Sequence, residues 1–433
     1  MRRKGSITRR ATVLGVAGAS ALALMGVLGA GGAYGATSHG RRADFSGTVH
    51  FTAMGPLTGS YAALGIPIVQ GTETAAYLIN KAGGILGKKL VVDPVDTKGD
   101  PADAATALAE EVALNHPAAI IGPITLEIHG VEPIFTRDKI LDGWNGGTPA
   151  FDHNTNKYLW RCNPSDSQQG VAMAGYAMLK GYKRAAMLFT SAAASQSFEP
   201  LIRASYARLG GKVVATKSIQ AGLPSYSSTV EAIVRAHPQV VFTQLTPPTA
   251  AAVFKNLESL GALNKFRWVG TTFMAGTTVV RAIGPSVSKA HMVSFIGSTA
   301  LSGAATLFRS TYVKVNHHAV ESGANFAYDC TIDFALAMTK AKSFTSTKVI
   351  KAIDQVSNPP GITVTTYAQG VKLLKKGKKI NYTGVSGPMN FNRYHNVIGG
   401  WSVVRAKGTA KGLISVIQTI SPTQITKFIS GKL

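Results

Sequence analysis

Short apolar runs alternate with amphipathic stretches along most of this chain, and this alternation predicts its elements. Runs of three to seven apolar residues bounded by polar or glycine positions indicate buried strands, whereas apolar residues three and four apart indicate helices. The first predicted strands are 48–53, 90–92, 118–121 and 159–162. A predicted helix, 68–80, lies between the first two. Because helices separate the strands, the sheet should be parallel.

The stretch 80–101 organises this first unit, because it holds the signals that end one helix and start the next. Gly83 and the glycine after it permit the positive φ angles with which helices end. Asp100 is a suitable N-cap for the following helix, and Pro101 suits its first turn. The inner face of that helix should carry Ala105, Leu108 and Val112.

The same alternation starts again after about residue 164. Predicted strands are 184–190, 212–216, 240–244, 266–270 and 293–297, and predicted helices are 170–179, 198–209, 230–236 and 248–260. Two further helices, 325–340 and 346–356, and a region 381–404 follow, while the tail from Gly408 gives no clear pattern. Two α/β units indicate two lobes, with ligands expected at the carboxyl ends of strands and in a cleft between domains.

The N-terminus, 1–35, is predicted to be a cleaved signal peptide. Five basic residues precede an apolar, uncharged run from 11 to 36, and small residues at 33–35 suit a signal peptidase. Arg9 and Arg10 before that run resemble a twin-arginine export signal. The alternative is an uncleaved anchor helix, because the run is long enough to span a bilayer. The cleavage site stays open, but an exported, extracytoplasmic protein is expected.

The chain is strongly basic, with 45 Lys and Arg against 21 Asp and Glu and a formal net charge of +24. Nucleic acid is not expected as a partner, because the basic residues are scattered and the densest cluster, 372–379, lacks interleaved aromatic residues. Charged residues total only 15%, so the imbalance reflects few acids. We hypothesise adaptation to acidic surroundings or to an anionic cell surface. This predicts folding that persists at low pH, since few carboxylates need to be protonated.

Cysteine and histidine give no metal-site pattern. Cys162 and Cys330 can form at most one disulfide, and their positions in sequence do not show whether they meet. Neither has a Cys or His neighbour at ligand spacing, and His317 and His318 are expected on a solvated helix face. No metal is therefore predicted.

The motifs of common enzymes are missing too. The mature chain has no Gly-x-Ser-x-Gly elbow, no His-Glu-x-x-His and no dinucleotide-binding glycine fingerprint. The paired acids Glu110 and Glu111 are expected on the solvent side of a helix. We therefore expect neither catalysis nor a cofactor.

Six motifs, in a fixed order along the chain, carry a family resemblance. They are 55–59 (Gly-Pro-Leu-Thr-Gly), 80–90 (Asn-Lys-Ala-Gly-Gly-Ile-Leu-Gly-Lys-Lys-Leu), 96–101, 121–123 (Ile-Gly-Pro), 161–170, and 384–388 (Gly-Val-Ser-Gly-Pro) before Phe391. With them the chain resembles the substrate-binding proteins of the branched-chain amino-acid (leucine/isoleucine/valine) type, which feed ABC importers.

The resemblance implies an α/β fold of two Rossmann-like lobes with parallel sheets joined by three crossovers, the type I periplasmic binding protein fold. Lobe I would combine 44–163 with 299–385, and lobe II 164–298 with 386–433. The crossovers would lie near Cys162, Gly297 and Gly384. A monomer would capture a small molecule between the lobes and deliver it to ABC transporter permease subunits. The alternative is a ligand-sensing receptor module that acts with a separate signalling partner.

The resemblance also assigns the ligand-lining positions, by counting along the motifs. In lobe I they are Tyr61 or Leu64 in the first loop, Thr125 and Leu126 in the second, and Gly146, Gly147 and Thr148 in the third. In lobe II they are Gln196, Thr246, Thr272 and Phe273. A threonine at a strand end is also often a turn or cap residue, so each threonine has a structural alternative.

Two of these positions depart from the family pattern. Leu126 stands where the family offers a serine hydroxyl to the ligand carboxylate, and Thr272 stands where it has the acid that pairs with the ligand ammonium. A buried ammonium without a carboxylate partner costs several kcal/mol. The sequence therefore predicts a ligand other than a free α-amino acid, namely a neutral or weakly acidic molecule such as an amide, an aromatic acid or a short carboxylate.

Overall fold

A computed structural model of the protein describes residues 45–298 and 303–433. The predicted export signal, 1–35, lies outside these residues. Within them, no helix combines the length and the apolar character that crossing a membrane requires.

The first sheet has five strands, all parallel, and confirms the first predicted unit. Its strands are β1 (Thr48–Gly55), β2 (Lys89–Asp96), β3 (Ala119–Ile121), β4 (Asp142–Trp144) and β5 (Leu159–Arg161). Their order across the sheet is β2-β1-β3-β4-β5. All five carboxyl ends therefore lie along one edge of this sheet.

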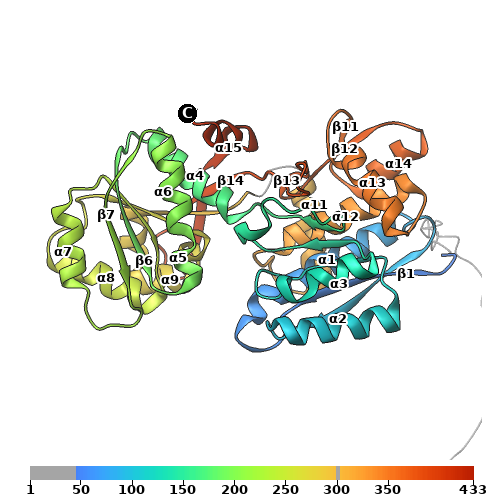
Figure 1. Ribbon diagram of the computed structural model, residues 1–433, viewed down its shortest axis with the longest axis horizontal. Coiled ribbons are helices and arrows are strands. Elements are labelled where there is room, and N and C mark those ends of the chain that lie inside the picture. Colours follow the sequence, from blue (N-terminus) through green and yellow to red (C-terminus); the bar gives the residue numbers. More distant parts are fainter. Residues whose placement is uncertain (1–44, 299–302) are drawn as a thin grey trace, which may run out of the picture. The chain divides into compact units, whose positions relative to one another are not determined.

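Helices cover both faces of this sheet, and the strand residues alternate between two cores (Figure 1). In β3, Ala119 and Ile121 belong to one core and Ile120 to the other. The first core is built with α1 (Ala62–Lys81), α11 (Gly303–Asn316), α12 (Ala324–Ala341), α13 (Ser346–Ser357) and α14 (Tyr367–Lys375). The second core is built with α2 (Pro101–Asn115) and α3 (Ile128–Asp138). A small sheet of β11 (Ile362–Val364), β12 (Ile380–Gly384) and β13 (Gly387–Pro388) follows α13.

The start of α2 is as predicted, but its buried face differs. The Asp100 side chain accepts hydrogen bonds from the N–H groups of Ala102 and Asp103 at 2.8 and 3.1 Å. The prediction that Glu111 lies on the solvent side is wrong, because this residue is only 7% exposed. Its carboxylate accepts a 2.8 Å hydrogen bond from the Thr52 hydroxyl on β1, which compensates for the burial.

The second sheet has seven strands and is mixed. Its strands are β6 (Arg184–Thr190), β7 (Lys212–Ile219), β8 (Val240–Gln244), β9 (Arg267–Gly270), β10 (Met292–Gly297), β14 (Trp401–Ala406) and β15 (Ile414–Ile420). The order across the sheet is β15-β14-β10-β9-β8-β6-β7. Strands β6 to β10 are parallel, whereas β14 runs antiparallel to β10 and β15 antiparallel to β14. The tail from Gly408 thus supplies an edge strand.

This sheet also has a core on each face (Figure 1). One core is built with α4 (Asp166–Leu179), α6 (Phe198–Arg208) and α15 (Pro422–Ile429). The other is built with α7 (Ser227–Arg235), α8 (Pro247–Ser259) and α9 (Thr277–Ile283). Two short helices, α5 (Ala193–Gln196) and α10 (Pro285–His291), complete the set.

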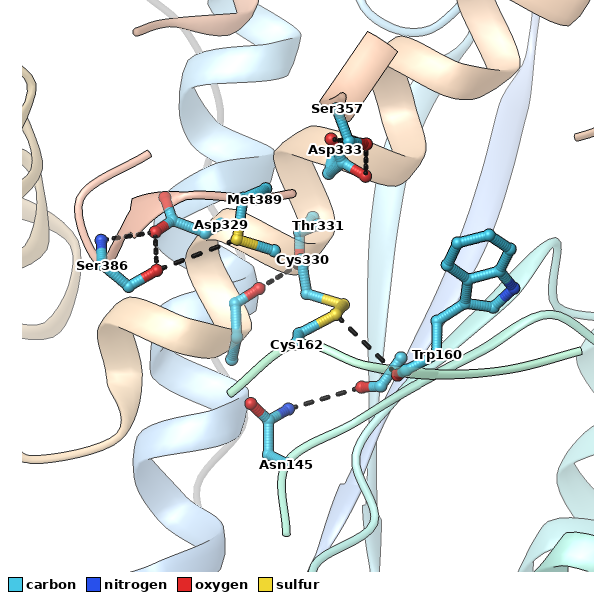
Figure 2. Close-up of a disulfide and its surroundings, with 12 residues drawn as sticks. Asn145, Trp160, Cys162, Asp329, Cys330, Thr331, Asp333, Ser357, Ser386 and Met389 are labelled. Atoms are coloured by element: carbon cyan, nitrogen blue, oxygen red, sulfur yellow. Dashed lines mark hydrogen bonds between the residues drawn. A yellow bond between two sulfur atoms is a disulfide. The ribbon is translucent and has the colours of Figure 1, made fainter. Parts of the chain in front are cut away.

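The two cysteines do meet, which the sequence left open. Cys162, directly after β5, and Cys330, inside α12, form a disulfide with an S–S distance of 2.10 Å (Figure 2). The preceding residue of α12, Asp329, is fully buried and accepts hydrogen bonds from the hydroxyl and the N–H of Ser386 and from the N–H of Val385.

The segment between β13 and β14 is paired with the residues around β5. The N–H of Arg161 donates to the carbonyl of His395 at 2.8 Å, and the N–H of Val397 donates to the carbonyl of Arg161 at 3.1 Å. The side chain of Gln168 on α4 then donates to the carbonyl of Val397 and accepts from the N–H of Gly399, at 3.0 and 3.1 Å.

The histidine pair is not on a helix face, contrary to the prediction. Helix α11 ends at Asn316, before both histidines. Gln70 Nε2 on α1 donates to His318 Nε2 at 2.8 Å. This residue therefore joins the turn after α11 to α1.

Candidate ligand-binding site

The ligand-lining positions predicted for lobe I follow three neighbouring strands of the five-stranded sheet. Strands β1, β3 and β4 are adjacent and parallel. The loops after them carry Tyr61, the pair Thr125 and Leu126, and the segment 146–148. In parallel sheets, ligands bind beside such loops.

The first loop is held in place by Asp96 at the end of β2. Its carboxylate accepts hydrogen bonds from the N–H of Leu57 at 2.8 Å, the hydroxyl of Thr58 at 2.6 Å and the N–H of Lys98 at 2.9 Å. Although desolvation acts in the opposite direction, these bonds lower the pKa of Asp96. The carboxylate therefore stays charged and fixes the loop.

Two exposed apolar side chains, Tyr61 and Leu126, lie beside Gly99. A Cβ at Gly99 would be 3.0 Å from Tyr61 Cδ2 and 3.6 Å from Leu126 Cδ1. Tyr61 ends a short 3-10 helix, η1 (Gly59–Tyr61), and is 48% exposed; Leu64, in the first turn of α1, is 53% exposed. This corner of the sheet edge therefore presents apolar surface to solvent.

The glycines after β4 are required by close packing. A Cβ at Gly146 would be 2.7 Å from the backbone nitrogen of Thr125, and a Cβ at Gly147 would be 2.1 Å from Oδ1 of Asp166. The N–H of Gly147 donates to the Thr125 hydroxyl at 3.0 Å. Thr125 therefore already bridges two of the predicted loops.

Thr148 serves as a cap, the structural alternative stated above. Its hydroxyl accepts a 3.4 Å hydrogen bond from Ala150 at the start of the 3-10 helix η2 (Pro149–Phe151). Its carbonyl accepts a 2.8 Å bond from Arg161, whose buried guanidinium also pairs with Asp152 at 2.6 Å and lies 4.5 Å from the Trp144 ring. Burial lowers the pKa of Arg161, and Asp152 opposes that shift.

The structure places an acid beside this loop that sequence reasoning missed. Asp166 is the first residue of α4, where its N–H donates to the carbonyl of Gly147 at 2.8 Å. Burial raises the pKa of Asp166 to about 6, while Arg161 acts in the opposite direction. The available signal was Ser165, an N-cap whose hydroxyl accepts from Gln168 at 3.3 Å and which marks the helix start.

The positions predicted for lobe II also follow three neighbouring parallel strands. Strands β6, β8 and β9 are adjacent in the seven-stranded sheet. Gln196 lies after β6, Thr246 after β8, and Thr272 and Phe273 after β9. Phe273 is 49% exposed and adds an aromatic face to this edge.

The polar side chains at this second edge already have protein partners. Gln196 Nε2 donates to the carbonyl of Thr190 at 2.7 Å and to the Ser218 hydroxyl at 3.0 Å. The hydroxyl of Thr246, the N-cap residue of α8, is 2.8 Å from that of Thr249. Thr272 opens the 3-10 helix η3 (Thr272–Ala275), and its hydroxyl accepts from Gln169 Nε2 on α4 at 3.0 Å.

Behind them lies a hydrogen-bond network that the sequence did not indicate. Thr190 donates to the Ser195 hydroxyl at 2.7 Å, Gln244 Nε2 donates to the same oxygen at 3.3 Å, and Thr271 donates to Gln244 Oε1 at 2.5 Å. The network joins the ends of β6, β8 and β9. The three loops thus form one fixed polar edge whose side chains are all uncharged.

No metal centre accompanies either edge. Across 45–298 and 303–433, no group of three or more His, Cys, Asp or Glu side chains is arranged to hold a metal ion.

With this geometry in place, comparison with known proteins decides the family. The profile of a family described as periplasmic binding protein matches residues 48–411, most of the chain. The chain belongs to the periplasmic binding protein family. Its resemblance to the branched-chain amino-acid type is confirmed by the relatives, and the family consists of substrate-binding proteins found outside the cytoplasm.

Two curated relatives illustrate the range of the family. A chemotactic signal transduction system substrate-binding protein of Halobacterium salinarum, BasB, is 24% identical over 80% of this chain and 83% of its own length. The Leu/Ile/Val-binding protein homolog 3 of Brucella melitensis is 28% identical over 43% of this chain. That match spans about half of the Brucella protein, 51%.

Solved structures confirm the type I periplasmic binding protein fold. The branched-chain amino acid transporter substrate-binding protein LivJ of Streptococcus pneumoniae, in complex with isoleucine, is 19% identical, with a TM-score of 0.67 over 87% of this chain and 100% of that chain. A solute-binding protein of an ABC transporter from R. palustris, in complex with benzoate, is 16% identical, with a TM-score of 0.65 over 87% of this chain and 97% of that chain. The fold is thus shared among proteins crystallised with different ligands.

Proposed function

We propose that this periplasmic binding protein captures a small molecule between its two sheet-bearing lobes and delivers it to the permease subunits of an ABC importer. The observation that carries the proposal is the pair of strand-end edges. Each gathers aromatic and polar side chains from three neighbouring parallel strands, and binding sites of this kind combine apolar walls with a few oriented polar groups. The lobe boundaries given above remain part of the proposal.

We propose further that the ligand is a neutral or weakly acidic molecule with an apolar or aromatic part. The exposed side chains of Tyr61, Leu126 and Phe273 suit such a part. The hydroxyl of Thr272 accepts a hydrogen bond from Gln169 where the family has an acid, so a ligand ammonium would find no carboxylate at that place. The benzoate complex of the R. palustris protein is an example of such a ligand on this fold.

Asp166 is the test case for this ligand class, because its carboxyl lies beside the Gly147 backbone. If an ammonium were bound beside the loop 146–148 instead, this carboxyl would be its partner. Asp166→Asn would then abolish binding. For a weakly acidic ligand, the same substitution removes a repulsion above pH 6 and improves binding. For a neutral ligand, it leaves binding unchanged.

A thermal-shift screen of the exported chain tests both the capture of a small molecule and the proposed class of ligand. The panel contains leucine, benzoate and other aromatic acids, amides and short carboxylates. A ligand at about 100 times its dissociation constant should stabilise the folded state by roughly 2.7 kcal/mol, which raises the melting temperature measurably. Thr272→Val and Phe273→Ala should weaken the shift. The matched control is Thr106→Val, at an exposed helical threonine whose hydroxyl donates to the carbonyl of Ala102 within α2.

The outcomes distinguish the capture of a solute from the class of ligand that is captured. A shift with leucine alone would refute the ligand class but leave capture of a solute intact. A shift with aromatic acids or amides, reduced by the two variants, would support both. Recovery of the bound molecule unchanged after prolonged incubation would support a binding role over catalysis.

The second candidate function is a ligand-sensing module, and the BasB relative specifically favours it. That protein belongs, by its name, to a chemotactic signal transduction system, and its match covers most of both chains. The sensing role requires a separate signalling partner. Co-purification with a permease would support import, and co-purification with a transducer protein would support sensing.

A further inference from the structure

A pocket lies at the end of the seven-stranded sheet opposite to the predicted ligand loops, where β9 and β10 begin. It is a cavity of about 180 Å³ on the face of the sheet that α4 covers. Its lining residues are Tyr176, Tyr182, Arg267, Trp268, Val269, Ala290, His291, Met292, Val293 and Arg405. The loops discussed above all follow the carboxyl ends of β6, β8 and β9, so this pocket is separate from the proposed solute site.

The alternation of side chains along two strands, together with the end of α10, explains why three basic residues line this pocket. Val269 and Val293 are paired neighbours in the core beneath α4, whereas Trp268 and Met292 belong to the opposite core. Residues two positions away in a strand share a face, so Arg267 lies on the face of Val269. His291 is the last residue of α10, directly before β10, and lines the pocket from there. Arg405 lies on the face of Val403, which belongs to the same core.

The strand register also sets the spacing of the two arginines. Ser294 pairs with Val404 in the antiparallel β10–β14 pair, so Arg405 is opposite Val293. Arg267 and Arg405 are therefore two strands apart and also offset by two residues along the strands, so their backbones are about 12 Å apart. Their long side chains can span this separation and converge on one molecule above β10. His291 directly precedes β10, the strand between them.

The lining is positively charged and carries no acid. In the described part of the chain, neither Arg267 nor Arg405 forms an ion pair or a side-chain hydrogen bond with an acidic group. Lys180 adds another positive charge nearby, with its Nζ 5.4 Å from the centre of the Tyr176 ring. Burial, together with the charge of Arg267, lowers the pKa of His291. The surroundings thus favour a negative charge.

A buried polar atom in the lining also has no partner. His291 Nδ1 is buried and makes no hydrogen bond within residues 45–298 and 303–433. An unpaired buried polar atom costs about 1–3 kcal/mol, so a bound molecule that pairs with it gains affinity. Tyr176 supplies a further donor, because burial raises the pKa of its hydroxyl and keeps the proton in place.

We propose that this pocket binds a small polyvalent oxyanion, held by Arg267 and Arg405 with His291 between them. Guanidinium groups bind phosphate and carboxylate oxygens through paired hydrogen bonds, and two of them suit a ligand with more than one negative charge. The volume is small compared with the roughly 300–1,000 Å³ of pockets for drug-sized ligands. It accommodates phosphate, a short phosphomonoester or a short polycarboxylate.

Isothermal titration calorimetry of the exported chain with inorganic phosphate tests the proposal. Sulfate and citrate are titrated separately, and chloride at equal ionic strength gives the background. We expect saturable phosphate binding that Arg267→Gln and Arg405→Gln each weaken at least about tenfold, the effect of one lost charge-assisted hydrogen bond. The matched control is Arg309→Gln, an exposed arginine on α11. It should bind phosphate as the unsubstituted chain does. Tighter binding of citrate than of phosphate would assign the site to carboxylates within the same oxyanion class.

Two results would overturn the proposal. One is the absence of saturable binding for every oxyanion tested, and the other is unchanged binding in both arginine variants. Melting temperatures measured without anion establish that the variants are folded. Since the solute screen uses other residues, failure of either experiment leaves the other proposal standing.

Discussion

Cys162 and Cys330 form a disulfide that ties the residue after β5 to the middle of α12. The preceding residue of α12, Asp329, holds Val385 and Ser386 by hydrogen bonds. Two consecutive helix residues therefore fix two segments that are far apart in sequence (Figure 2).

Loss of the disulfide should destabilise the protein substantially. The bond closes a loop with a sequence separation of 168 residues, and long loops lose much conformational freedom in the unfolded state. Replacing both cysteines by serine should lower the free energy of unfolding by about 2–5 kcal/mol. Urea unfolding with and without reductant measures this. Reductant should shift the midpoint of the unsubstituted chain alone, and an equal shift in the double variant would contradict the assignment.

Stability should decrease between about pH 4 and pH 6. Burial raises the pKa of Asp329 to about 6, despite its hydrogen bonds, from an ordinary value of 3.8. The folded state therefore keeps a proton that the unfolded chain releases in this interval, and this contribution is lost as the pH rises through 6. The contribution of Asp329 to the free energy of unfolding is about 3 kcal/mol. Asp166, with a pKa also near 6, acts in the same direction.

Unfolding at pH 4.5 and pH 7.5 measures this difference in stability. Asp329→Asn should reduce the difference, whatever its effect on absolute stability. Asp138 provides the control, because its hydrogen bond with Arg137 lowers its pKa, so its contribution is lost only at a pH below the ordinary value of 3.8. Asp138→Asn should therefore leave the difference between pH 4.5 and pH 7.5 nearly unchanged. Equal pH dependence in the Asp329 variant and the unsubstituted chain would refute the assignment.

Gly71→Ala should destabilise the contact between α1 and α12. A Cβ at Gly71 would lie 2.2 Å from the carbonyl oxygen of Ala324, so the helices must separate. Overpacking of this kind costs about 1–3 kcal/mol. Gly303→Ala is the matched control, since nothing lies within 4 Å of a Cβ there. The control should be neutral or slightly stabilising, and equal unfolding midpoints for the two variants would show that the helices are less closely packed.

Gly147→Ala should weaken binding of the captured solute. The added Cβ would lie 2.1 Å from Oδ1 of Asp166, which forces that carboxyl or the loop to move. Because Gly147 also bonds to Thr125, the movement would reach two of the proposed ligand loops. Titration with a ligand from the thermal-shift screen measures the loss. Restored affinity in the Gly147→Ala, Asp166→Ala double variant would show that crowding, rather than the glycine itself, is the cause.

The parallel strands were predictable because a buried strand appears in the sequence as a short run of apolar residues. The predicted bounds of β6 and β8 agree with the structure residue for residue. Asp100 was predictable because a cap acts through local hydrogen bonds. Helices α3, α5, α9, α10, α11 and α14 were not predicted, and α15 was missed although Ser421 and Gln424 form a capping box.

The other features that the sequence did not predict depend on contacts between residues that are far apart in the sequence. Burial of Glu111 depends on a hydroxyl on β1, and the disulfide depends on where α12 packs. The edge strand β15 leaves a weak pattern, because Val416 and Ile417 are both exposed. The ligand-lining residues remain predictions. The structure adds Asp166 and the network around Gln244, which required knowledge of neighbouring strands.

The pairing of Arg161 with His395 and Val397 has a mechanical consequence. It secures both of these chain segments to the five-stranded sheet, so bending toward the seven-stranded sheet along these two connections is limited to 163–165 and 398–400. The side-chain amide of Gln168 on α4 hydrogen-bonds to Val397 and to Gly399, and so connects α4 to the segment 398–400 and the residue before it. The stiffness of a closing motion along these connections would then depend on this amide and on the bond from the Asp166 N–H to the Gly147 carbonyl, and its amplitude on a handful of backbone torsions.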